Sequence, residues 1–131
     1  DALTGGDDNV VFGTNAATAL TTGSSNVAIG HVALAAETTG SRNVAVGQGT
    51  LNALTHGGEA YNVAVGYQAG VAVSSGTHNV LVGGKAGDSL TTGSYNIAIG
   101  YEALQYENAH GKNVAIGYLS LTLQQVFITQ F

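Results

Sequence analysis

A five-residue motif that recurs at a nearly constant interval constrains the fold of this chain more than any other feature. Its clearest copies read Asn-Val-Ala-Ile-Gly or Asn-Val-Ala-Val-Gly, and seven copies, two of them looser, occur within 131 residues. Successive copies start 17 residues apart, except between Asn43 and Asn62, where the interval is 19 residues. Such regularity identifies a repeat protein, in which each unit buries its apolar side against its neighbours. The motifs begin at Asn9, Asn26, Asn43, Asn62, Asn79, Asn96 and Asn113 and end at Gly13, Gly30, Gly47, Gly66, Gly83, Gly100 and Gly117.

The residues between the motifs indicate how one unit is built. Two variable residues follow the glycine, then often an Ala-Leu pair such as Ala33-Leu34, then a Thr-Thr-Gly turn such as that at 38–40. Ala-rich segments such as 31–37 favour a helix, but the glycines leave about nine residues for it, too few to be stable alone. The alternation within the motif has the period of a strand. We therefore expect a short strand, a glycine turn, a second short strand around Ala-Leu, and a Thr-Gly turn.

Strands this short become stable when successive units stack about 4.8 Å apart and pair their main chains. The sequence thus predicts an all-β fold, a parallel β-solenoid of about seven rungs of 17 residues. Residues 9–117 form this repeat β-roll, and residues 1–8 align with the end of a preceding rung. Two internal ladders are expected, formed by Val10, Val27, Val44, Val63, Val80, Ile97 and Val114 and by Phe12, Ile29, Val46, Val65, Val82, Ile99 and Ile116.

The small residue between the two ladders is predicted to face away from the core. A stripe of alanine along the roll would let a second roll approach closely, which predicts a homo-oligomer of three chains. The leading asparagines are predicted to cap turns through side-chain bonds to the backbone, as asparagine commonly does. The alanine stripe consists of Ala28, Ala45, Ala64, Ala98 and Ala115.

Two segments depart from the repeat. The two surplus residues lie within 54–61, and an insertion in a solenoid is expected to bulge at a turn without shifting the rungs on either side. Residues 118–131 lose the glycine turns and carry bulky apolar residues. This segment is either a terminal cap on the stack or a strand that pairs with a neighbouring subunit or with a downstream domain.

Composition and side-chain chemistry argue against several classes of function. Only three basic residues, Arg42, Lys85 and Lys112, accompany eight acidic ones, which disfavours binding to nucleic acid or to anionic lipid. No apolar run approaches the roughly 20 residues of a membrane helix. Cysteine is absent, the four histidines occupy unrelated repeat positions, and no acid–base or nucleophile set can be identified. We therefore expect no enzyme activity, no cofactor, no metal site and no insertion into a membrane.

Two positions vary from repeat to repeat and are therefore expected to be exposed. They are the residue before each motif asparagine and the residue after each motif glycine. Tyrosine recurs at both, and its ring is an amphipathic contact group common at surfaces that bind sugars or proteins. The candidate contact surface consists of Tyr67, Tyr101 and Tyr118 in one column and Tyr61 and Tyr95 in the other.

The motif copies, the Ala-Leu pairs and the Thr-Thr-Gly-Ser turns resemble the head repeats of trimeric autotransporter adhesins, the YadA-like heads, and related repeats of bacteriophage tail fibres. The resemblance covers roughly residues 2–120. It implies a left-handed parallel β-roll, three chains side by side, displayed on a bacterial cell surface or a virion. The role it implies is adhesion or receptor binding. The coiled-coil stalk and membrane anchor of those adhesins do not occur in this sequence, so only the head-type fold carries over.

Three functions follow from these patterns. The first is a structural and adhesive module of an extracellular fibre, which contacts a surface glycan or protein receptor through its outer face. The second is a filament subunit whose ends stack on one another, a heterologous contact that does not close. The third is an ice-binding solenoid, since stacked Thr22, Thr39 and Thr92 form a regular array.

Overall fold

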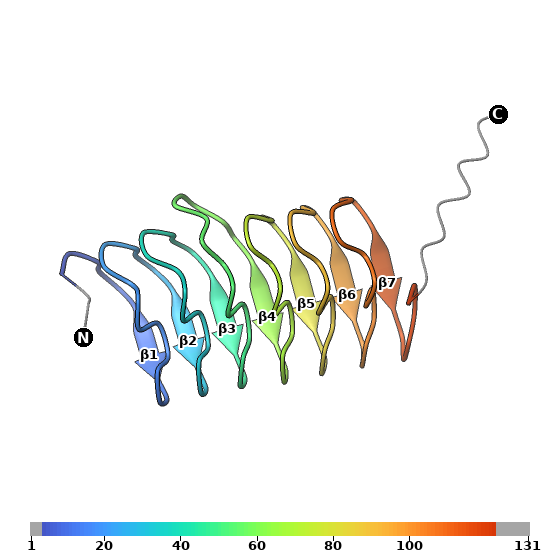
Figure 1. Cartoon of the computed structure of the whole chain (residues 1–131), viewed down its shortest axis with the longest axis horizontal. Coiled ribbons are helices and arrows are strands. Elements are labelled where there is room, and N and C mark those ends of the chain that lie inside the picture. The colour runs from blue at the N-terminus through green and yellow to red at the C-terminus, as the bar shows by residue number, and fades with distance from the viewer. Residues whose placement is uncertain (1–3, 123–131) are drawn as a thin grey trace.

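The computed structural model describes residues 4–122, and these form an all-β solenoid with one seven-stranded parallel sheet and no helix. Each strand pairs with the next in sequence, so the order in the sheet is β1 to β7 (Figure 1). Equivalent residues of successive motifs are direct partners, as in the pairing of Ala28 with Ala45. The predicted parallel β-solenoid is confirmed. The strands are β1 (Val10–Phe12), β2 (Val27–Ile29), β3 (Val44–Val46), β4 (Val63–Val65), β5 (Val80–Val82), β6 (Ile97–Ile99) and β7 (Val114–Ile116).

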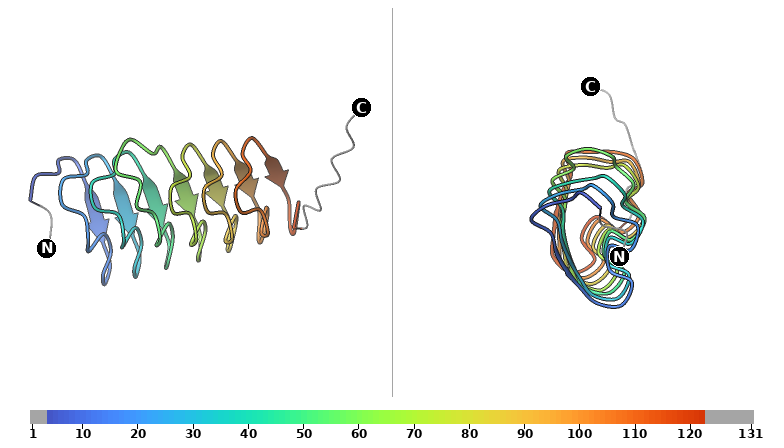
Figure 2. Two further views of the ribbon diagram at one scale, coloured as in Figure 1. Left: turned by 45° about the horizontal axis from the view of Figure 1, so that its top comes forward. Right: turned by 90° about the vertical axis from the view of Figure 1, so that its left-hand side faces the viewer.

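Backbone hydrogen bonds join successive rungs well beyond the strands. The amide of Val27 donates to the carbonyl of Asn43 at 2.8 Å, and in the opposite wall the amide of Leu34 donates to the carbonyl of Thr50 at 3.0 Å. Successive rungs therefore lie one behind the next with a gradual offset when the roll is viewed along its axis (Figure 2). This satisfies the polar backbone of turns that would otherwise be buried without partners.

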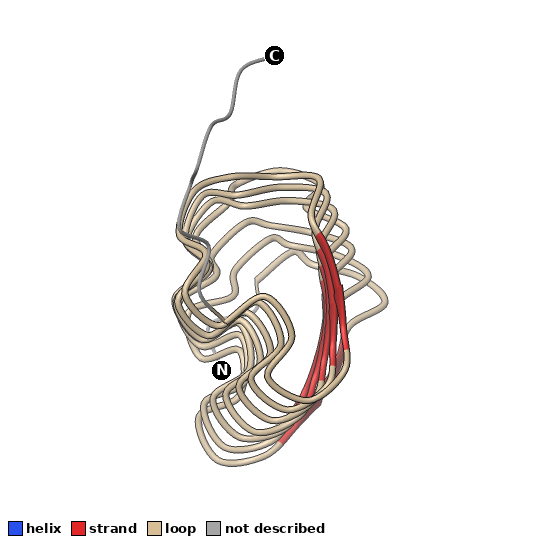
Figure 3. Ribbon diagram, turned by 90° about the vertical axis from the view of Figure 1, so that its right-hand side faces the viewer, coloured by secondary structure: helices blue, strands red, loops and turns tan. Residues whose placement is uncertain are grey.

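The second strand that we predicted around Ala-Leu is not formed. Val32 and Leu34 have φ angles of 51° and 52°, in the left-handed region, so the backbone there is not extended. The wall opposite the strands folds inwards, toward them (Figure 3). The inward fold carries the Leu34 side chain into the core, where it is fully buried.

The predicted assignment of inner and outer faces is wrong, because the alanine column lies inside the roll. The opposite wall already supplies leucines such as Leu34 and Leu51 to the core, so the facing strand has room for little more than a methyl group. The bulkier residues on either side of each alanine point outwards, and the two predicted internal ladders are external. Alanine inside the roll cannot form the predicted oligomer stripe. The buried inward residues are Ala28, Ala45, Ala64, Leu81, Ala98 and Ala115, each at most 1% exposed.

Leu81 is the exception in the alanine column, and two glycines in the opposite wall compensate for its size. Leu34, Leu51 and Leu104 occupy one repeat position of that wall, but Gly70 and Gly87 replace leucine there in the rungs beside Leu81. A methyl group added to Gly70 would stand 2.6 Å from Leu81 Cδ1, and one added to Gly87 would stand 3.0 Å from Leu81 Cδ2. Leu81 therefore fills the volume that the two missing leucines leave.

The motif asparagines form a buried ladder along one corner of the roll, which confirms and extends the predicted capping role. The Oδ1 atom of Asn26 accepts the backbone N–H of Asn43 at 3.0 Å and its side-chain amide at 3.2 Å. The Nδ2 atom of Asn26 donates to the carbonyl of Gly40 at 2.9 Å, in the Thr-Thr-Gly turn. The same bonds recur at other rungs, so an asparagine such as Asn79 joins two rungs and closes one turn.

The two-residue surplus bulges at the turn before β4, which extends beyond its neighbours (Figure 1). The pairing of Val44 with Val63 keeps the repeat register across it, as predicted. The bulge changes the ladder locally, because the Nδ2 atom of Asn43 donates to the carbonyl of Ser41 instead of a turn glycine. The Nδ2 atom of Asn62 donates to the carbonyl of Gly76 but not to Asn43, whose Oδ1 still accepts the Asn62 backbone N–H at 3.3 Å. Of the segment 118–131, residues 123–131 lie outside the described residues, and so do residues 1–3 of the leading rung.

Glu37 and Glu107 are buried at a repeat position that leucine occupies in other rungs, for example Leu20 and Leu90. In a regular rung the turn amide of Thr21 donates to the carbonyl of Thr38 on the next rung. By the same repeat rule, the amide of Thr38 would donate to the carbonyl of Thr55, which lies at the start of the longer turn. Glu37 Oε1 accepts the amides of residues 38–40 instead, at 2.8 to 3.3 Å. Glu107 does the same for the amides of residues 109 and 110. In the turn after Glu37, a buried carboxylate thus replaces leucine where the amides of residues 38–40 do not donate to the next rung.

We predict that Leu81→Ala destabilises the roll by about 3 kcal/mol, since it leaves a cavity in a fully buried site. Adding Gly70→Leu should recover at least half of this loss, because leucine already occupies the same position, at similar φ, in neighbouring rungs. Urea unfolding followed by circular dichroism measures both variants. Gly70→Leu alone serves as the control, and it should destabilise because Leu81 occupies the space. A double variant less stable than Leu81→Ala would contradict the assigned compensation.

We also predict that Glu37→Leu lowers the free energy of unfolding by about 2 kcal/mol, because three backbone amides lose their acceptor while the side-chain volume is kept. Glu37→Gln retains an acceptor oxygen and should cost less than half as much. The same unfolding measurement compares the two. Equal losses in both variants would show that the charge matters and the acceptor does not.

Candidate contact surfaces

The residue before each motif asparagine projects from one edge of the roll and forms a stacked column. These residues all have φ between 53° and 64°, a left-handed conformation that recurs in every rung. The rings of Tyr61 and His78 stack with centroids 5.1 Å apart, and those of His78 and Tyr95 stack at 4.8 Å. The predicted contact residues Tyr61 and Tyr95 are therefore brought together, with His78 between them. We refer to Arg42, Tyr61, His78, Tyr95 and Lys112 as the stacked column.

Arg42 and Glu59 close the end of the stacked column nearer the N-terminus. The guanidinium of Arg42 lies over the Tyr61 ring, 5.7 Å from its centroid, and Arg42 Nε donates to Glu59 Oε1 at 2.8 Å. The Tyr61 hydroxyl donates to Glu59 Oε2 at 2.6 Å. These bonds, from Tyr61 first and from Arg42 second, lower the pKa of Glu59, and the bond to Glu59 raises the pKa of Tyr61. Glu59 belongs to the longer turn, so the surplus residues bring a carboxylate to this end.

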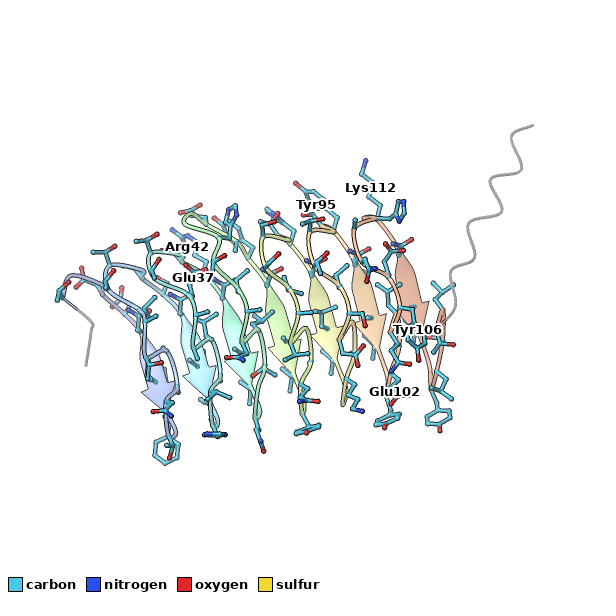
Figure 4. All side chains as sticks on the ribbon, viewed as in Figure 1. Glu37, Arg42, Tyr95, Glu102, Tyr106 and Lys112 are labelled. Atoms are coloured by element: carbon cyan, nitrogen blue, oxygen red, sulfur yellow. The ribbon has the colours of Figure 1, made fainter. Side chains whose placement is uncertain are left out.

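The other end of the stacked column is open. Tyr95 is 57% exposed and has a ring partner on one side only, His78. Lys112 follows one rung later, where its side chain extends away from the roll on the same edge as Tyr95 and Arg42 (Figure 4). The column therefore has a neutralised end at Arg42 and Glu59 and a basic end at Lys112.

The residue after each motif glycine forms a second column that holds the remaining candidate tyrosines. The rings of Tyr101 and Tyr118 stack with centroids 5.8 Å apart, on adjacent rungs as the spacing predicts. Tyr67 is exposed but has no stacked ring among the described residues, because Gly84 occupies the rung between it and Tyr101. Hydrogen bonding to Glu102 raises the pKa of Tyr101. Glu102 lies on the edge of the roll opposite Arg42, Tyr95 and Lys112, so the two columns occupy opposite edges (Figure 4).

Two groups at this surface, His78 and Glu59, are not among the contact residues predicted from the sequence. The four histidines do not share one repeat position, although His78 lies 17 residues from both Tyr61 and Tyr95. That spacing assigns His78 to the same repeat position as the two tyrosines. Glu59 gave no such signal, because it lies in the only turn of irregular length and its position depends on how that turn folds.

The outward face of the sheet is a third surface, and it is apolar along its whole length. Its two columns are the β-branched and aromatic residues that flank the inward alanines. Several of them are between 36% and 75% exposed, and most of the others are half-buried. A continuous apolar stripe is unusual on a monomeric protein and is typical of interaction surfaces. The most exposed members are Val10, Phe12, Val65, Ile97, Ile99, Val114 and Ile116.

Within residues 4–122, no group of three or more histidine, cysteine or acidic side chains is placed to hold a metal ion. The same residues include no helix long and apolar enough to span a membrane. His110 pairs with the buried Glu107, at 2.9 Å between Nδ1 and Oε1.

Comparisons of the chain with known protein families, with characterised proteins and with solved structures find no match.

We predict that Glu59 titrates below the usual glutamate pKa of about 4.3, because Tyr61 and Arg42 bond its charged form. Tyr61→Phe removes the larger of these contributions and should move the pKa of Glu59 upward, still below its usual value because Arg42 remains. The contacts stabilise the fold above the usual pKa of Glu59 and are lost as pH falls through the lowered one. Carboxyl ¹³C NMR titration measures the shift. Tyr95→Phe is the control, and an equal change there would contradict the assignment.

Proposed function

We propose that this chain is a non-enzymatic structural and adhesive module of an extracellular fibre. In this proposal three copies lie side by side with their sheet faces toward a common axis, and the outer edges contact a surface glycan or a protein receptor. The resemblance to adhesin heads and tail-fibre repeats adds the expectation of a left-handed roll displayed on a bacterial cell surface or a virion.

The observation that carries this proposal is the apolar outward face of the sheet. Solvent-exposed Ile97 and Ile99 continue a stripe that runs from β1 to β7, and apolar area buried between chains stabilises association by about 25 cal/mol per Å². A stripe on one side of a straight rod is buried completely when parallel rods surround a common axis. This arrangement replaces the alanine stripe as the basis for a trimer and is of the closed kind that most homo-oligomers adopt.

The two aromatic columns support the adhesive part of the proposal. They lie on opposite edges of the roll, and tyrosine at these positions is 43% to 74% exposed. Stacked rings hold a fixed conformation at little entropic cost on binding, which suits a contact surface. In an assembly that buries the sheet face, the columns are placed outside the strands.

End-to-end stacking into a filament is the second candidate, and the state of the first rung favours it. Val11 occupies the inward position that alanine takes elsewhere, yet it is 44% exposed. Strands β1 and β7 each have one partner among residues 4–122, and an unpaired strand edge is a template for another chain. Electron microscopy separates the two candidates, since a fibre module gives short rods of uniform length and a filament subunit gives long ones.

We predict that the purified chain sediments as a trimer, at three times its mass of 13.1 kDa. Ile99→Glu should produce monomers, because a carboxylate at a desolvated apolar interface costs on the order of 3 kcal/mol per chain. The side chain points outwards, so the fold of each monomer should be kept. Sedimentation equilibrium measures the mass and circular dichroism the fold.

Thr92→Glu is the matched control, because Thr92 is exposed in a turn away from the sheet face. It should remain trimeric. A wild-type monomer with a β spectrum, or a trimer of the Ile99→Glu variant, would contradict the proposed interface.

A further inference from the structure

The stacked column exposes one aromatic face beside one free positive charge. Of the three basic side chains, Arg42 pairs with Glu59 and Lys85 lies 3.8 Å from Glu102. Lys112 has no ion pair within the described part of the chain. It is exposed, and it is one rung beyond Tyr95 at the same repeat position.

Most ring faces in this column are already covered. His78 has a tyrosine ring on each side, and Tyr61 lies between His78 and the Arg42 guanidinium. A ligand that packs on an aromatic face therefore has no access to Tyr61 or His78, whose edges alone reach solvent. Tyr95 has a covered face toward His78 and an uncovered face toward the rung of Lys112.

We propose that Tyr95 and Lys112 form a subsite for a pyranose ring that carries a carboxylate. The C–H face of the sugar packs on the free face of Tyr95, and the carboxylate meets the ammonium of Lys112. Rungs are about 4.8 Å apart, so a ring in van der Waals contact with Tyr95 lies at the level of Lys112. A neutral sugar uses only the aromatic half of this subsite.

The distribution of charge confines the attraction for a carboxylate to one part of the surface. The chain carries a net charge of −5, which repels acidic ligands over most of its surface. Arg42 at the other end of the column is neutralised by Glu59, with Nε and Oε1 2.8 Å apart. The attraction to a carboxylate is therefore confined to the neighbourhood of Lys112 and should weaken as salt is added.

This inference rests on the proposed adhesive function and names the class of ligand for one of its contact surfaces. The test uses the full chain with three oligosaccharides: sialyllactose, a uronic acid tetrasaccharide and lactose. The two acidic probes distinguish sialic acid from uronic acid as the source of the carboxylate. Amide NMR titration should show shifts concentrated near residues 95 and 112 for at least one acidic probe, with lactose at least about fivefold weaker.

Matched variants separate the subsite from general effects of charge or ring removal. Lys112→Gln and Tyr95→Ala should each weaken acidic-sugar binding at least about fivefold, and Lys112→Arg should retain it. Lys85→Gln removes a paired positive charge and Tyr106→Ala removes a ring that is also 57% exposed, and neither should change binding. Circular dichroism confirms that each variant is folded.

Three outcomes would overturn the inference: no binding of either acidic probe, equal binding of lactose, or binding that survives both Lys112→Gln and Tyr95→Ala. None of them affects the sedimentation of the chain as a trimer. Conversely, a monomeric chain that binds an acidic sugar through these two residues would refute the proposed fibre assembly and leave the subsite intact. The two proposals therefore fail separately.

Discussion

The asparagine ladder is the interaction on which the rest of the structure depends. An isolated unit has a three-residue strand, far too short to be stable. The buried Oδ1 atom of Asn26 takes up the backbone N–H and the side-chain amide of Asn43, while its own Nδ2 closes the turn at Gly40. Each amide side chain thus fixes both the distance to the next rung and the length of its own turn. Any change in unit length has to preserve this alignment. The bulge before β4 keeps the bond from the Asn62 backbone N–H to Asn43 Oδ1 and changes only side-chain amide bonds.

Left-handed backbone positions explain how so regular a stack presents side chains to solvent. A non-glycine residue in this conformation costs roughly 1 kcal/mol, and the position before each motif asparagine adopts it in every rung. The conformation turns the chain into the strand and directs the side chain outwards. Because the position repeats at the rung spacing, neighbouring rings such as Tyr61 and His78 stack without further adjustment. Contact between these side chains offsets part of the local strain.

The solenoid could be predicted from the sequence because the interval between motifs is a long-range signal that local propensity does not carry. The inner and outer faces of the strand could not be predicted, because alternation within Val-Ala-Ile indicates two faces but does not identify which of them lies in the core. The opposite wall determines which face of the strand is internal, because Leu34 and Leu51 enter the core from left-handed turns there. The sequence pattern predicts a strand at those residues instead. Tyr101 and Tyr118 could be placed on adjacent rungs from spacing alone. The role of Glu59 depends on an irregular turn, for which no repeat position exists.

In this fold the residues of the core can change without moving the residues of the outer surface. Leu81 and the two glycines opposite it redistribute core volume without moving the strand, so the outward residues Val80 and Val82 keep their register with β4 and β6. The outward residues of each rung are therefore insensitive to this change in the core. In the stacked column this independence lets a single position hold arginine, tyrosine, histidine and lysine in succession. The result is a column with a neutralised end and a basic end on an otherwise acidic rod, a polarity that uniform repeats would not produce.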